Sequence, residues 1–192
     1  GGSAIETNAS LGAGDYRQYT LPFAAAGQAF TLEYFLQIIS SGGDNDGFAE
    51  NRQEMLRLFG ANIDDYRHTA NGAIGGATNH VLTGPSAQSC AHAAFGITGG
   101  KTERVHIVYQ RYAGLGCQCF LNGRYVNEDG TGTAAMTGLL VGGRGLTSRN
   151  ARAWIDGLRF MRGEAVYPAR TLEAHGDVVF TPPTVPFLPD EA

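Results

Sequence analysis

The stretch AWIDGLRFMRG, at residues 153–163, decides the fold. Its apolar residues do not keep one alternating phase, because Leu158 and Phe160 alternate properly whereas Ile155 is out of step with them. The Asp-Gly step at 156–157 stands where the phase changes, which is what a β-bulge with a glycine hinge produces. We therefore predict a long core strand that bends midway and carries the only tryptophan of the chain.

The clearest alternation of apolar and polar residues lies at 29–38. One face carries the apolar side chains Phe30, Leu32, Tyr34, Leu36 and Ile38, and the other carries Thr31, Glu33 and Gln37. This period of two predicts a half-buried strand of an antiparallel sheet, with its polar face toward water.

Four more segments have the pattern of strands. Residues 105–112 are apolar on both faces, which predicts a central strand, and Asn122-Gly123 between two strand-like runs predicts a hairpin with a type I′ turn. Residues 49–59 favour a strand centred on 55–59, although a helix there remains an open alternative. Strands that recur without helical partners predict an all-β sandwich.

Composition narrows the class of protein. The chain has 192 residues, 28 of them Gly, and only 17% are charged, which suits one domain of short strands joined by many turns. The net charge of −4 argues against a nucleic-acid partner or a basic membrane surface. No apolar run is long enough to span a bilayer. The odd count of three cysteines gives no disulfide framework, so we expect Cys117 and Cys119 to be small buried hydrophobic residues.

The motifs, taken in order, resemble one superfamily. They are FTLE at 30–33, VHIVY at 105–109, FLNG at 120–123, LVGG at 140–143 and IDGLRF at 155–160. This ordered set resembles the concanavalin A-like lectin/glucanase superfamily, and within it the laminin G-like modules. The resemblance implies a jelly-roll β-sandwich of two antiparallel sheets.

The end of the chain extends the resemblance. GEAVY at 163–167 and FTPPTVPF at 180–187 look like the terminus of such modules in bacteriophage and prophage tail proteins. We accordingly divide the chain into an N-terminal arm or edge strand at 1–14, the sandwich at 15–179 and a proline-rich C-terminal tail at 180–192.

A catalytic site is not expected. Glucanases of this fold carry a Glu-x-Asp-x-x-Glu pattern, which places nucleophile and acid/base on one face of a strand. The chain has no such pattern, and Glu33 is followed by aromatic residues. We therefore expect a protein that is not an enzyme.

Calcium is the only cofactor that the sequence suggests. Asp44, Asp46 and Glu50 offer oxygen ligands at calcium-like spacing, and laminin G-like modules often bind calcium through loop carboxylates. The competing interpretation is a solvated turn rich in Asp and Asn.

The ligand-binding candidates lie in the polar, Gly-rich stretch at 61–84, which we predict to be rich in loops. Aromatic rings that stack on sugars, and amide or guanidinium groups that bond hydroxyls, are what a shallow glycan site needs. The candidates are Tyr66, Arg67, His68, Asn71 and Asn79. A plain surface loop is the alternative.

The sequence thus predicts a non-enzymatic binding module of a phage or prophage virion, assembled in the host cytoplasm. Its expected partners are other virion proteins, a host-surface glycan and further copies of the chain, with neither nucleic acid nor membrane. One alternative is a decorating or cementing protein that contacts only other virion proteins. A glycoside hydrolase is a minor alternative.

Overall fold

The structure is a computed structural model. It describes residues 5–7, 17–38, 52–60, 66–72, 77–83, 89–91, 99–100, 104–129, 134–142 and 153–184. Within these ranges every regular element is a β-strand, and none is a helix long and apolar enough to span a membrane.

The strands form two antiparallel sheets. Sheet A has six strands in the order β1 (Ile5–Thr7), β13 (Ala153–Arg162), β3 (Phe30–Ile38), β9 (Arg104–Tyr112), β10 (Gly116–Leu121) and β11 (Arg124–Asp129). Sheet B has seven, in the order β2 (Arg17–Ala24), β12 (Met136–Val141), β4 (Arg52–Gly60), β5 (Tyr66–Gly72), β6 (Ala77–Thr83) and β7 (Ser89–Ala91), with β8 (Gly99–Gly100) beside β6.

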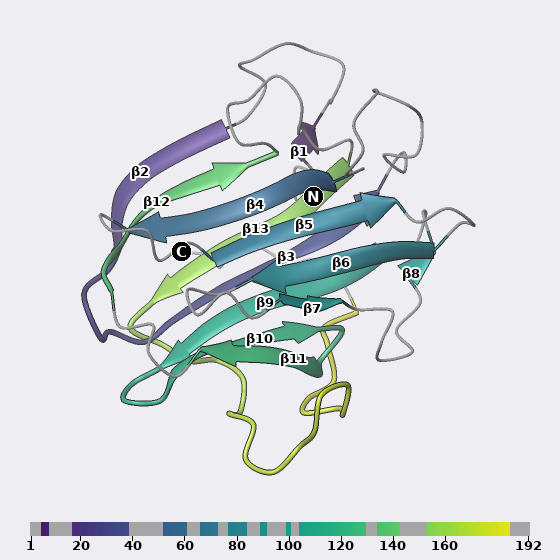
Figure 1. Cartoon of the computed structure of the whole chain (residues 1–192). Helices are drawn as coiled ribbons and strands as arrows, with labels where there is room; N and C mark the ends of the chain where they lie inside the picture. The colour runs from purple at the N-terminus through teal and green to yellow at the C-terminus, as the bar shows by residue number, and fades with distance from the viewer. Residues whose placement is uncertain are drawn as a thin grey trace.

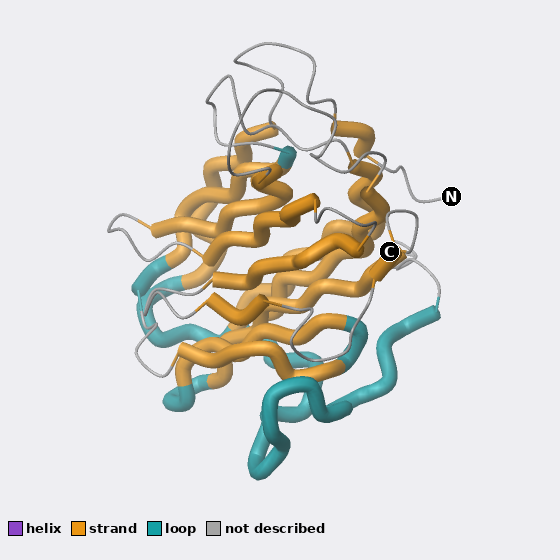
Figure 2. The backbone as a smooth tube through the Cα atoms, turned by 45° about the vertical axis from the view of Figure 1, so that its right-hand side comes forward, coloured by secondary structure: helices purple, strands orange, loops and turns teal. Residues whose placement is uncertain are grey.

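The two sheets are stacked face to face (Figures 1 and 2). The core lies between them, where Leu32 and Tyr34 of β3 belong to the same buried cluster as Met55 and Leu58 of β4. Cys117 and Cys119 lie in the same cluster as buried free thiols, as expected. The predicted fold class, an all-β jelly-roll sandwich of two antiparallel sheets, is confirmed.

The bend in β13 is also confirmed. Its pairing with β3 shifts register between Asp156 and Arg159, and Gly157 has φ 58°, in the left-handed region that favours glycine. The bulge resets the alternation of inward and outward residues along the strand. As a result, Ile155 before the bulge is fully buried in the core, and Phe160 after the bulge packs against the same core.

Other local predictions hold as well. β9 lies between β3 and β10 and is buried from Val105 to Tyr112, as a central strand should be. Residues 52–60 form strand β4, which excludes the helix alternative there. Asn122 (φ 49°) and Gly123 (φ 73°) turn the chain from β10 to β11, as a type I′ turn requires.

One prediction about β3 is wrong. The polar face of this strand was expected to meet water, but Thr31 and Glu33 are both 0% exposed. The reason is a C-terminal segment, residues 163–184, that packs on the outer face of sheet A. We call this segment the strap.

Candidate functional site

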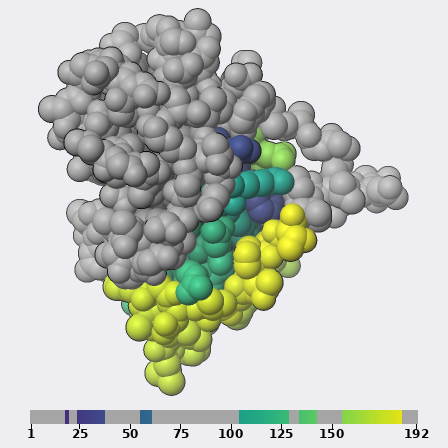
Figure 3. Space-filling view, turned by 90° about the vertical axis from the view of Figure 1, so that its right-hand side faces the viewer, coloured from purple at the N-terminus to yellow at the C-terminus, as the bar shows by residue number. Residues whose placement is uncertain are grey.

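The strap crosses sheet A on the face opposite the core. It follows β13 directly, where Gly163 donates its N–H to the Ala29 carbonyl at 2.7 Å, and it returns along β11, where Val178 forms a β-bridge with Arg124. In the space-filling view it lies against the strands of residues 104–129 (Figure 3).

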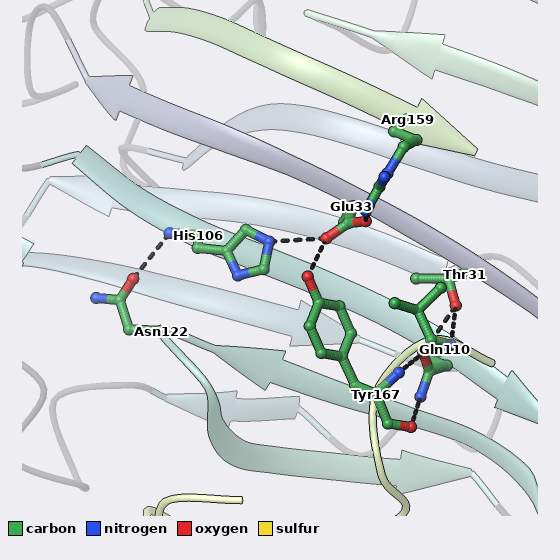
Figure 4. Close-up of polar contacts among 8 residues, drawn as sticks. Thr31, Glu33, His106, Gln110, Asn122, Arg159 and Tyr167 are labelled. Atoms are coloured by element: carbon green, nitrogen blue, oxygen red, sulfur yellow. Dashed lines mark hydrogen bonds and ion pairs between the residues drawn. The ribbon is translucent and has the colours of Figure 1, made fainter. Parts of the chain in front are cut away.

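A buried carboxylate fixes the strap to the sheet (Figure 4). The Glu33 Oε2 atom lies 3.0 Å from Nε2 of His106 on β9 and accepts the Tyr167 hydroxyl of the strap at 2.5 Å. Its Oε1 atom accepts Nε–H of Arg159 on β13 at 2.8 Å, and a second bond from the same guanidinium. One side chain thus links β3, β9, β13 and the strap.

The environment of Glu33 keeps it ionised. Burial by itself raises the pKa of the carboxyl, but the bonds from His106, Tyr167 and Arg159 together outweigh burial and hold the pKa below its ordinary value. The pKa of the Tyr167 hydroxyl shifts in the opposite direction. It is raised by burial and by the bond to the Glu33 carboxylate.

A second polar cluster satisfies the backbone of the strap. Gln110 donates from Nε2 to the Tyr167 carbonyl at 2.7 Å and accepts the Tyr167 N–H at 2.9 Å. Thr31 accepts the Val166 N–H at 3.1 Å, and the Tyr112 hydroxyl donates to the Pro168 carbonyl at 2.8 Å. These side chains take the place of a neighbouring strand, so the irregular backbone is not left unbonded when it is buried.

Aromatic packing completes the attachment. Tyr167 stacks on Phe180 at 4.0 Å, and Phe180 meets Phe120 at 5.2 Å in a T-shaped contact. Phe180 is only 9% exposed. The residue that begins the predicted proline-rich tail is therefore packed on the sandwich.

Beside β11 the strap forms a groove of about 380 Å³ that is open to solvent. We call it the rim groove. It is lined by Tyr125 and Glu128 of β11 and by Arg170, Ala174 and His175 of the strap. The volume lies within the range of small-ligand sites.

The groups of the rim groove are held in place by one another. The Arg170 guanidinium lies 4.3 Å from the centre of the Tyr125 ring and donates to Glu128 Oε1 at 2.8 Å. The His175 ring stacks on Tyr125 at 5.0 Å with an interplanar angle of 20°. Donors, acceptors and a flat ring therefore face one small opening.

The residues expected to bind a ligand lie elsewhere. Tyr66, Arg67, His68 and Asn71 belong to β5, and Asn79 belongs to β6 directly opposite Asn71. The prediction that this stretch is rich in loops is wrong for 66–72 and 77–83, because β4 supplies a pairing edge for β5 and β5 supplies one for β6. The binding role of these residues stays a prediction.

The calcium candidates Asp44, Asp46 and Glu50 lie outside the described residues. Where the structure describes side chains, it contains no group of three or more His, Cys, Asp or Glu placed to hold a metal ion.

Sequence reasoning gave no role to Glu33, His106, Arg159 or Arg170. For Glu33 the sequence did contain a signal, namely a carboxylate between aromatic residues of a strand. Burying a carboxylate there costs free energy unless it has bonding partners, so its position indicates that partners exist. Its partners could not be found that way, because Tyr167 is 134 residues distant along the chain.

No protein-family model matches the sequence, and no curated protein matches it. Solved structures do. The botulinum neurotoxin serotype D binding domain aligns with a TM-score of 0.52 at 9% identity, over 80% of this chain and 38% of that one. A mutant of HCR/D aligns with a TM-score of 0.50 at 10% identity, over 81% and 38%.

A mutant of the NanB sialidase from Streptococcus pneumoniae gives a TM-score of 0.46 at 11% identity, over 86% of this chain and 26% of that one. The chain spans little more than a third of the length of the neurotoxin domain. At this identity the first two likenesses establish a shared β-sandwich fold.

Proposed function

We propose that this chain is a non-enzymatic binding module of a phage or prophage virion protein, and that its ligand is a glycan on the surface of the host bacterium. In this proposal the sandwich belongs to the concanavalin A-like superfamily and assembles with copies of itself and other virion proteins in the host cytoplasm. The fold shared with a neurotoxin binding domain and the motifs at 163–167 and 180–187 support it.

The rim groove is the observation that carries the proposal. It combines the imidazole of His175, an exposed residue, with an arginine and a carboxylate at the edge of a sheet. Hydroxyl groups of a sugar need such donors and acceptors, and a sugar ring needs a flat face to pack on.

The state of Glu33 supports binding rather than hydrolysis. Glycoside hydrolysis uses a pair of carboxyl groups that flank the sugar bond. Glu33 is 0% exposed and is bonded to His106, Arg159 and Tyr167, so a substrate has no access to it.

A second candidate function is purely structural. Leu172 is 94% exposed and Val178 is 55% exposed, and both lie on the strap. Exposed apolar side chains on a projecting segment favour contact with another protein, which suits a decorating or cementing role in the particle.

Binding to a glycan array and to intact host cells tests the first proposal. The labelled chain is expected to bind at least one bacterial surface polysaccharide and to compete with virions for adsorption, without releasing reducing sugar. Binding to neither glycans nor cells would reject adsorption in favour of the structural role. Release of sugar would identify a hydrolase.

A further inference from the structure

We propose that the rim groove binds one neutral pyranose unit, with the sugar ring against His175 and two adjacent hydroxyls on Glu128 and Arg170. This inference rests on the proposed function and names the site and the class of ligand.

The first part of the argument concerns the flat surface. Tyr125 is only 2% exposed, whereas His175, which stacks on it, is exposed. One face of the imidazole is therefore supported by a buried ring, which fixes the orientation of the imidazole beside the groove. A fixed aromatic plate loses little rotational freedom when a sugar packs on it, which favours binding.

The second part concerns the hydroxyl contacts. The Arg170 guanidinium is fixed by its bond to Glu128 and by a 2.8 Å bond from NH1 to the Glu173 carbonyl. Its side chain is still 25% exposed and that of Glu128 is 43% exposed. A donor and an acceptor thus lie side by side at the surface, so that one sugar hydroxyl can donate to the carboxylate while its neighbour accepts from the guanidinium.

The third part concerns charge. Glu128 is the carboxylate and Arg170 the guanidinium that line the groove, and the two are paired with each other at 2.8 Å. Arg170 also bonds the carbonyl of Glu173, whose side chain stays charged because three backbone N–H groups, led by that of Thr171, hold its pKa below the ordinary value. The guanidinium of the groove therefore gives a sugar that carries a carboxylate or phosphate no unshared positive charge, which leaves neutral pyranoses as the fitting class.

The fourth part concerns rigidity. The turn that carries His175 is closed on itself by a bond from the Ala174 N–H to Asp177 Oδ2 at 2.9 Å. It is joined to β11 by bonds from the Gly176 N–H to the Tyr125 carbonyl at 2.8 Å and from the Tyr125 N–H to the Asp177 carbonyl at 2.9 Å. The groove is therefore formed before a ligand arrives.

Titration of the ¹⁵N-labelled chain followed by NMR tests the inference. The probes are the methyl pyranosides of glucose, galactose and mannose, with N-acetylneuraminic acid as the anionic comparison. We expect at least one neutral pyranoside to shift the backbone amides of residues 170–177 with millimolar affinity, and to bind about tenfold more tightly than the anionic sugar.

Three variants separate the groove from the rest of the surface. His175→Ala and Glu128→Ala should each weaken binding by about tenfold, since each removes one contact. Glu164→Gln, which neutralises an exposed strap carboxylate away from the groove, should leave affinity unchanged. Thermal melting of each variant checks that the fold is retained.

The outcomes distinguish this inference from the proposed function. If the wild-type chain binds a host glycan and both groove variants bind it equally well, the glycan site lies elsewhere and only the groove assignment fails. Tighter binding of N-acetylneuraminic acid than of every neutral pyranoside overturns the ligand class. Absence of binding to all glycans and all four probes overturns both proposals.

Discussion

At the scale of single residues, Glu33 joins three other segments of the chain to β3. It is ionised inside the protein, and three groups from three different segments share its two oxygens. Charge-assisted bonds of this kind offset the free energy lost when a carboxylate leaves water. The arrangement therefore specifies where β9, β13 and the strap meet.

Replacement of Glu33 by Gln is expected to lower the free energy of unfolding by about 3 kcal/mol, because Arg159 and His106 lose their buried anionic partner. Urea denaturation measures the change. Glu164→Gln is the matched control and should change stability by less than about 0.5 kcal/mol, since that side chain is exposed.

The difference between wild type and Glu33→Gln should also depend on pH. The pKa of Glu33 in the folded protein lies below its ordinary value of 4.5, so its contribution is complete above about pH 4.5. As the pH falls through the folded-state pKa, the unfolded chain takes up the proton first and the contribution is lost. A difference that stays constant from pH 7 to pH 3 would contradict this account.

At the scale of elements, the turn between β10 and β11 has two roles. Gly123 adopts positive φ for the hairpin, and it lies so close to the strap that an added Cβ would stand 1.9 Å from the Phe180 carbonyl oxygen. Asn122 accepts the His106 N–H on its side-chain oxygen at 2.8 Å, which fixes the turn against β9. Gly123 is therefore constrained by both the local turn and the distant strap, and Asn122 by the turn and β9.

We expect Gly123→Ala to cost about 3 kcal/mol, of which about 1 kcal/mol is backbone strain and the rest is displacement of the strap. Gly114→Ala is the matched control, since Gly114 also has positive φ but has open space where its Cβ would be. Chemical denaturation gives the two costs, and limited proteolysis within 170–178 reports loosening of the strap. Equal costs for the two variants would show that the strap does not press on the turn.

The strap itself acts as a third layer. It covers Val108, Phe120 and Tyr125, which form an apolar cluster separate from the main core. Burial of such rings contributes about 25 cal/mol for each Å² removed from water. The segment is therefore part of the folded sandwich.

Truncation tests the role of the strap. A chain that ends at Arg162 should expose this cluster, bind the dye ANS and lose cooperative unfolding. A chain that ends at Thr184 keeps the strap and should unfold cooperatively. Equal melting of both truncated chains would refute a structural role for residues 163–184.

At the scale of the whole molecule, the sheets provide rigidity and the strap provides the groove. β11 is the last strand in the order of sheet A, and the strap runs beside it at the edge of the sandwich (Figure 1). The rim groove, which is lined by both segments, therefore lies at this border. Loops and segments held on a rigid frame are where binding groups usually lie. The glycan ligand that we propose would reach such a border without entering the core.

Much of this architecture could be predicted from the sequence, and the groove could not. The bend at Gly157, the turn at Asn122-Gly123 and the central position of β9 each follow from a few neighbouring residues. Arg111 shows the limit. Its guanidinium is buried and bonds the carbonyls of Gln28, Ala25 and Ala134, although sequence alone favours a solvent-facing arginine.

The sequence by itself determined the elements that local chemistry controls: alternation of apolar residues, glycine where φ is positive, and turns that join adjacent strands. Only the tertiary structure decided which polar residues are buried and which surround a groove. Glu33 meets Arg159 across 126 residues and Tyr167 across 134. Such contacts depend on how the layers stack, and the periodicity of a single strand carries no information about the layer that will cover it.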